Sequence, residues 1–169
     1  VLELGAGTGQ DTHFLIDHGF QVTATDFSKP ALDLNWETAN TKTRKRLQIQ
    51  QLDLEKPFPY NDQSFNVIYA HLVVHYFNKQ ITQQIFDEIS RVLRPGGIVA
   101  LLVNSIDDSE YGRGRKIEED FFELRPERPK RYFSVNSLRT FTGRFEALVL
   151  DNKGADPRRD HKTGLIRFI

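Results

Sequence analysis

Three glycines at alternate positions follow a short apolar run at the start of the chain, and no other feature constrains the fold as strongly. Residues 1–9 read VLELGAGTG, which predicts a buried strand turning into a loop, and helix-compatible sequence follows at once. Glycine lets the backbone turn sharply and approach a ligand without a Cβ in the way, and the following helix offers unpaired N–H groups. We therefore predict a nucleotide-binding loop between a strand and a helix.

Strand and helix signals alternate through the first hundred residues, a pattern typical of a parallel α/β sheet. Strands are expected at residues 1–4, 21–25, 47–52, 65–70 and 98–103. Helices are expected from residue 8 or 10 to 18, at 30–39 and at 80–93. Ser28 and Pro30 suit the start of the second helix, and the PGG sequence at 95–97 ends the third.

The sequence changes character after Asn104. A charged segment with scattered aromatic residues occupies positions 107–131, and we interpret residues 105–133 as a cover rather than as core. A short helix capped by Ser134 is expected at residues 134–141. Two last strands, at 145–150 and 163–169 and joined by a polar loop at 151–162, are expected to add an antiparallel pair to the sheet.

Composition limits the function classes. The 169 residues suit one domain, and the 23 basic and 23 acidic residues give no overall attraction to nucleic acid or to an anionic membrane. The absence of cysteine excludes disulfides, thiolate metal sites and a cysteine nucleophile. No apolar run is long enough for a membrane span, so a soluble protein is expected, and the absence of cysteine is compatible with a cytoplasmic location. Because the chain lacks methionine and begins within a strand, we expect further residues, including an N-terminal cover, before Val1.

Polar residues follow the expected strands at one edge of the sheet. The glycine loop follows the first strand, Asp26 the second and Asp53 the third. In a doubly wound sheet, ligands bind at the carboxyl ends of the strands, near the switch in strand order. There, Asp26 can accept hydrogen bonds from both ribose hydroxyls, and Asp53 can meet an exocyclic amine on a base. These loops are therefore expected to converge on one crevice.

The glycines depart from the dinucleotide fingerprint GxGxxG, because the third lies at position 9 rather than 10. ELGAGTG, TDFS at 25–28, LDLEKPFPYNDQSFNVIYAHLVVHYF at 52–77 and RVLRPGGIVALL at 91–102 together resemble the class I S-adenosylmethionine-dependent methyltransferases. The tail more loosely resembles their small-molecule branch, which includes tellurite-resistance-type enzymes. The resemblance implies a doubly wound, mostly parallel seven-stranded Rossmann-like sheet of order 3-2-1-4-5-7-6 with an antiparallel last strand.

The same resemblance implies which residues border S-adenosylmethionine. Those around the methionine part are Glu3, Gly5, Ala6, Gly7, Gly9, Ala70 and His71. Those around the ribose and adenine are Asp26, Phe27, Asp53 and Leu54. Most of them have alternative roles. The three glycines can be ordinary turn residues, and Asp53 can be a solvated loop acid. Asp26 can also cap the next helix, Phe27 can pack in the core, and Glu3 can cap a neighbouring helix or bind a loop N–H.

The implied reaction is direct displacement, in which an acceptor atom takes the activated methyl group from sulfur. It depends mainly on alignment and desolvation. His71 and Tyr76 are candidate bases for an acceptor that loses a proton. The cover at 105–133 is expected to lie over the acceptor, with a wall formed by Glu110, Tyr111, Phe121, Phe122, Tyr132 and Phe133.

Several alternatives stay open at the level of sequence. His71 and His75 have the spacing of zinc ligands on one helix face, but no HExxH acid lies between them, so no metal is expected. The competing functions are an NAD(P)-dependent oxidoreductase and a module that binds S-adenosylmethionine without catalysis. The expected partner is a small-molecule acceptor. The sequence carries no strong signal for nucleic acid, no membrane partner is expected, and the expected state is a monomer or homodimer.

Overall fold

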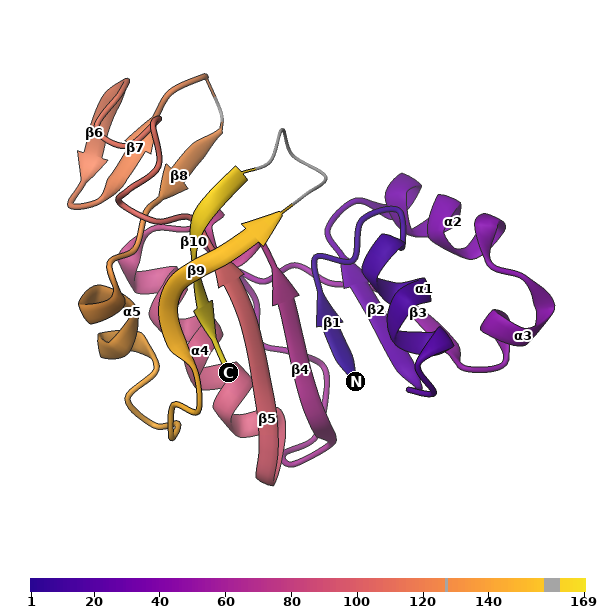
Figure 1. Cartoon of the computed structure of the whole chain (residues 1–169). Helices are drawn as coiled ribbons and strands as arrows, with labels where there is room; N and C mark the ends of the chain where they lie inside the picture. The colour runs from indigo at the N-terminus through magenta and orange to yellow at the C-terminus, as the bar shows by residue number, and fades with distance from the viewer. Residues whose placement is uncertain (127, 157–161) are drawn as a thin grey trace. The chain divides into compact units, whose positions relative to one another are not determined.

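The computed structural model describes residues 1–126, 128–156 and 162–169 (Figure 1). The chain forms two compact units. The first unit comprises residues 1–71 and 91–99, and the second comprises residues 72–90 and 100–169. Strand β5 (Leu93–Val103) contributes its first part to one unit and its last part to the other.

The first unit contains four further strands, which alternate with helices much as the sequence predicts. Its strands are β1 (Leu2–Leu4), β2 (Val22–Asp26), β3 (Leu47–Gln51) and β4 (Phe65–His71). Its helices are α1 (Gln10–Asp17), α2 (Lys29–Thr38) and the short α3 (Thr41–Arg44), the last of which was not predicted.

The second unit holds the remaining elements. Its helices are η1 (Val74–Tyr76), a single 3-10 turn, most of α4 (Lys79–Val92), and α5 (Val135–Phe141). Its strands are β6 (Arg115–Glu118), β7 (Phe121–Glu123), β8 (Pro129–Arg131), β9 (Leu150–Asp156) and β10 (Lys162–Phe168). The described helices include none long and apolar enough to cross a membrane.

The seven-stranded sheet has the order β3-β2-β1-β4-β5-β10-β9, which confirms the predicted order and the α/β class. Strand β1 runs parallel to β2 and β4, with Leu4 paired to Thr25 on one side and to Ala70 on the other. Strand β10 is antiparallel to β5, as predicted for the last strand. The register of β1 brings the residues that follow Leu4, Thr25 and Ala70 to one edge of the sheet.

Helices α1 and α2 pack on β2 in the first unit, and their apolar side chains enclose a small core with it. Its buried members are Ala6, Ile16, Val22, Ala24, Leu32, Ala39 and Leu47. Both predicted serine caps are present, since Ser28 accepts the N–H of Ala31 and Ser134 forms a reciprocal capping box with Ser137.

The strand predicted at residues 145–150 is wrong, because β9 begins only at Leu150. The preceding residues continue the turn after α5, where the N–H of Phe145 donates to the carbonyl of Thr142. Polar residues form β9 because Asp151 pairs with Arg167 on β10 and because Gly154 admits close packing: a Cβ there would lie 2.5 Å from Leu102. Of the predicted loop at 151–162, residues 157–161 lie outside the described part of the chain.

Two further boundaries differ from the predictions. Strand β5 begins at Leu93 rather than at residue 98, directly after α4, and so includes the PGG sequence. The segment predicted as a cover contains a separate three-stranded sheet of order β6-β7-β8. Its strands are short, and their charged and aromatic residues lack a long period-2 pattern, which explains why the sequence did not reveal them. Its role as a cover stays a prediction.

Both the backbone conformation at position 9 and the atoms around it require glycine. The φ of Gly9 is +94°, and a Cβ added there would lie 2.2 Å from Oδ1 of buried Asn35. Gly19 has the same φ of +94°, but a Cβ added there would meet nothing within 4 Å. The two glycines therefore separate the cost of left-handed backbone from the cost of a steric clash.

We expect Gly19→Ala to lower the free energy of unfolding by about 1–2 kcal/mol, the cost of a left-handed residue with a Cβ. Gly9→Ala should cost at least about 1–3 kcal/mol more, because the new methyl group overpacks the space held by Asn35. Urea unfolding followed by circular dichroism measures both. Equal losses in the two variants would contradict the clash.

Candidate functional site

The glycine loop connects β1 to α1 at the carboxyl edge of the sheet. Gly5, Gly7 and Gly9 all have positive φ, at 71°, 54° and 94°. The N–H of Ala6 donates to the carbonyl of Thr25 at 2.8 Å, which holds the loop against the end of β2. A Cβ at Gly7 would meet no atom of the described residues within 4 Å, so among these residues the backbone is open to a ligand at this point.

Asp26 joins the glycine loop to the start of α2. Its Oδ2 accepts the N–H of Gly7 at 2.9 Å, and its Oδ1 accepts the N–H of Ser28 at 2.8 Å. Asp26 is partly exposed. Because each carboxylate oxygen can accept more than one hydrogen bond, the group keeps acceptor capacity for the hydroxyls of a ribose. Ser28 is the N-cap of α2, so the capping role considered for Asp26 is wrong, and binding of a ribose by Asp26 stays a prediction.

Glu3 lies behind the loop, with only 2% of its surface exposed. Its Oε2 accepts the hydroxyl of Thr12 on α1, and this hydroxyl in turn accepts an N–H from the amide of Asn35 on α2 at 3.0 Å. The three buried side chains thus join β1, α1 and α2. Through Thr12, Glu3 bonds a side chain of the neighbouring helix α1, and contact between Glu3 and a cofactor stays a prediction.

The positions predicted around the adenine differ in exposure. Phe27 is 71% exposed, so the alternative of core packing does not hold, and its ring is accessible to a ligand. Leu54 is buried. Asp53 is partly exposed, accepts the N–H of Glu55 at 3.0 Å and pairs with Lys56 at 3.2 Å. The N–H of Leu52 donates to the carbonyl of Asp26, which holds the loop after β3 beside the end of β2.

The end of β4 supplies the remaining predicted positions of the first unit. Ala70 is buried and offers mainly its backbone. His71 Nδ1 lies 2.7 Å from Oδ2 of Asp11 in the first turn of α1. Asp11 was missed at the level of sequence, and so were Thr12 and Asn35. The only available signal was the place of Asp11 and Thr12 in the helix directly after the glycine loop, and nothing in the sequence pointed to Asn35.

Tyr76 and His75 belong to η1 in the second unit. His75 is buried and packs against the ring of Tyr76, whereas Tyr76 is exposed. The described residues contain no group of three or more histidine, cysteine or acidic side chains that could hold a metal ion. The role of Tyr76 as a base stays a prediction.

Most residues predicted to form an acceptor wall are instead buried within the second unit. These buried residues are Phe121, Phe122, Tyr132 and Phe133. Glu110 is partly exposed and pairs with Lys130 at 2.6 Å. Tyr111 is exposed, and its hydroxyl donates to Asp120, an interaction that raises the pKa of Tyr111 to about 12. Of the six predicted residues, Glu110 and Tyr111 are therefore the accessible ones.

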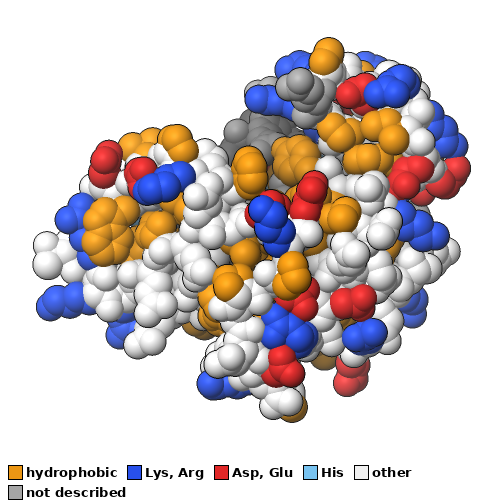
Figure 2. All heavy atoms as spheres, turned by 180° about the vertical axis from the view of Figure 1, so that it is seen from behind, with side chains coloured by type: hydrophobic (Ala, Val, Ile, Leu, Met, Phe, Trp, Pro, Cys, Tyr) orange, Lys and Arg blue, Asp and Glu red, His pale blue; other side chains and the backbone are white. Residues whose placement is uncertain are grey.

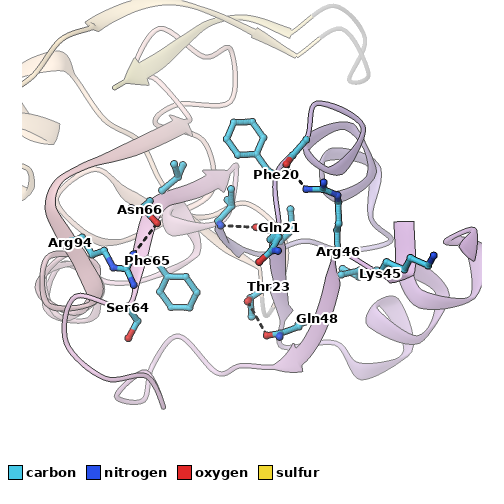
Figure 3. Close-up of a pocket in the computed structure, with 15 residues that line it drawn as sticks. Phe20, Gln21, Thr23, Lys45, Arg46, Gln48, Ser64, Phe65, Asn66 and Arg94 are labelled. Atoms are coloured by element: carbon cyan, nitrogen blue, oxygen red, sulfur yellow. Dashed lines mark hydrogen bonds between the residues drawn. The ribbon is translucent and has the colours of Figure 1, made fainter. Parts of the chain in front are cut away.

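A hollow of about 800 Å³ lies at the opposite, amino edge of the first unit's strands (Figure 3). It is lined by the first residues of β2, β3 and β4 and by none of the predicted cofactor-binding residues. Two of its basic side chains already have partners within the chain: Arg46 donates to the carbonyl of Gly19, and Arg94 donates to Gln63 and Asn66. The hollow is thus distinct from the edge that carries the glycine loop.

The sequence and the fold of the chain are similar to those of known proteins. The methyltransferase domain family matches residues 2–101, more than half of the chain, including the glycine loop, Asp26, Asp53 and His71. The chain belongs to the S-adenosylmethionine-dependent methyltransferase family. This result confirms the predicted family and with it S-adenosylmethionine as the family's cofactor, and it does not support the NAD(P)-dependent alternative.

Individual methyltransferases and related proteins cover different parts of the chain. A PKS-NRPS hybrid synthetase of Chaetomium globosum is 37% identical over 121 residues, which are 66% of this chain and 2% of the synthetase. A methyltransferase of Methanosarcina mazei has a TM-score of 0.84 at 20% identity, covering 99% of this chain and 89% of its own. The 1,6-didemethyltoxoflavin-N1-methyltransferase of Burkholderia thailandensis, solved with S-adenosylhomocysteine bound, has a TM-score of 0.78 at 20% identity, covering 99% of this chain and 68% of its own.

The two structural matches show the fold. The chain spans less than half the length of the first curated relatives that it matches.

Replacement of Thr12 by valine tests the buried network. The side chain keeps its shape but loses the hydroxyl that bonds Glu3 and Asn35, so we expect the free energy of unfolding to fall by about 1–3 kcal/mol. Thr38→Val is the matched control, because this exposed hydroxyl bonds only backbone carbonyls of its own helix. It should change stability by about 0.5 kcal/mol or less. Equal effects in chemical denaturation would contradict a structural role for the network.

Proposed function

We propose that this methyltransferase domain binds S-adenosylmethionine at the carboxyl edge of β1–β4 and transfers its methyl group by direct displacement to a small-molecule acceptor. The carrying observation is the pair of hydrogen bonds from Gly7 and Ser28 to Asp26. They hold an open glycine loop and a ribose acceptor in one place. The cofactor supplies a methyl group already activated by its positively charged sulfur.

Different residues of the first unit contact the ribose, the adenine and the methionine part of the cofactor. Asp26 accepts the ribose hydroxyls, and the exposed ring of Phe27 lies against adenine. Asp53 and Leu54 meet the amino edge of the base. Around the methionine part, the positive-φ glycines let the backbone approach closely, and the backbone of Ala70 borders the site.

His71 is the proposed base of the first unit. It follows Ala70 directly at the end of β4 and is mostly buried, so water has limited access to its ring. An imidazole in such a position can accept a proton from an oxygen, nitrogen or sulfur atom that is being methylated. Alignment and exclusion of water supply the rest of the rate.

Two observations support a small-molecule acceptor. The neighbour from Burkholderia thailandensis is named for a small heterocyclic substrate. On the face shown in Figure 2, Lys and Arg side chains lie among Asp and Glu side chains, in keeping with the equal numbers of basic and acidic residues. Such mixing gives little electrostatic attraction for the phosphate backbone of a nucleic acid.

Asp26→Ala removes the acceptor of two backbone N–H groups and of the ribose hydroxyls. We expect the affinity for S-adenosylhomocysteine, measured by isothermal titration calorimetry, to fall more than tenfold. Asp33→Ala is the control, since this exposed carboxylate pairs with Lys29 on α2, the helix that follows Asp26. The affinity of this variant should stay within about twofold of the wild type. Unchanged affinity in Asp26→Ala would count decisively against the proposed pocket.

Two further measurements address the competing functions. Fluorescence titration with NADH should give no saturable binding, whereas an oxidoreductase would bind it. Release of S-adenosylhomocysteine from S-adenosylmethionine in the presence of small hydroxyl, amine and thiol acceptors would show transfer. Binding without release across such a panel would favour a module that binds the cofactor without catalysis.

A further inference from the structure

The contact between Asp11 and His71 joins two residues that lie 60 positions apart in the chain. Oδ2 of Asp11 and Nδ1 of His71 are 2.7 Å apart. Asp11 lies in the first turn of α1, directly after the glycine loop, and His71 is the last residue of β4. Both therefore lie at the edge that carries the proposed cofactor site.

The surroundings restrict both side chains. The side chain of His71 is 13% exposed and that of Asp11 is 24% exposed. The ring of Tyr69 lies edge-on to the imidazole, with centroids 6.3 Å apart. A short hydrogen bond to a carboxylate and an aromatic neighbour thus restrict the orientation of the imidazole. A restricted orientation is what a group needs to accept a proton along a defined line.

The chemistry of the contact decides which ring nitrogen holds the proton of a neutral imidazole. An ionised carboxylate only accepts hydrogen bonds, so the nitrogen that faces it at 2.7 Å must carry hydrogen. With the proton on Nδ1, the lone pair of the ring lies on Nε2. The basic atom of His71 is then the nitrogen on the far side of the ring from Asp11.

We propose that Asp11 is a positioning residue that orients His71 and holds its proton on Nδ1, so that Nε2 is the atom that accepts a proton at the methyl-transfer site. This inference rests on the proposed function. An acceptor O–H, N–H or S–H group forms a bond from its lone pair to the methyl carbon, while the electrons of the broken C–S bond return to sulfur. The proton of the acceptor group moves to Nε2. His71 then becomes an imidazolium whose Nδ1–H still faces the carboxylate of Asp11.

Nitrogen NMR of the full chain tests the proposal without knowledge of the acceptor. Long-range ¹⁵N–¹H spectra at alkaline pH report which ring nitrogen of each neutral histidine carries hydrogen. The signals of His71 are assigned by their loss in His71→Gln. We expect the Nδ1–H tautomer in the wild type. The Nε2–H tautomer in the wild type would overturn the proposal.

Asp11→Asn provides the decisive variant. The new amide can donate an N–H to Nδ1, which would drive the ring proton to Nε2, so the tautomer should switch. Asp17→Asn is the matched control, because Asp17 is an exposed acid at the other end of the same helix, and the tautomer should stay unchanged. An unchanged tautomer of His71 in Asp11→Asn would show that Asp11 does not hold the ring proton on Nδ1.

Addition of S-adenosylhomocysteine separates a positioning role from a purely structural one. We expect the Nε2 resonance of His71 to shift on addition of the ligand, because the proposal places this atom at the methyl-transfer site. Calorimetry on the same samples shows independently whether the ligand binds. Binding without a shift would overturn the inference alone, whereas absence of binding to the wild type would overturn the proposed function.

Discussion

A carboxylate that accepts one backbone N–H from the glycine loop and one from the start of α2 organises the first unit. Asp26 ends β2, and its two oxygens bind Gly7 of the glycine loop and Ser28 at the start of α2. Hydrogen bonds to an ionised acceptor are stronger than those between neutral groups. Asp26 thereby provides acceptors for two N–H groups in turns, where the backbone cannot form the regular hydrogen bonds of a sheet. The conformation that leaves the loop open for a ligand depends on this side chain.

A buried network behind the loop explains why the loop must be glycine at its last position. Glu3, Thr12 and Asn35 join one strand to two helices, and Asn35 occupies the space into which a Cβ of Gly9 would project. Burial of a carboxylate is costly unless it accepts hydrogen bonds, and the hydroxyl of Thr12 provides one. The left-handed backbone at Gly9 and the polar network are thus parts of one packing solution.

The two edges of the parallel strands differ in what their polar groups do. At the amino edge, the guanidinium groups of Arg46 and Arg94 are hydrogen-bonded to groups of the chain itself. At the carboxyl edge, Phe27 is exposed and Asp26 keeps acceptor capacity beyond its backbone partners. This asymmetry follows from parallel strands, whose carboxyl ends place the loops of several β–α units side by side.

Local sequence determined the α/β class and the edge at which the glycine loop and Asp26 lie, and the resemblance of its motifs to known methyltransferases implied the family and the strand order. Glycine spacing, apolar runs and helix caps are short-range signals, so they can be read without knowledge of the fold. Tertiary structure alone decided that β9 lies at Leu150–Asp156. Its polar residues form a strand because they pair with β10 and because Gly154 has no Cβ that would clash with its neighbours.

Only tertiary structure, too, brought Asp11 to His71 and Asn35 to Gly9. These partners are far apart in the chain, and their contact depends on how α1, α2 and β4 pack, which no local pattern encodes.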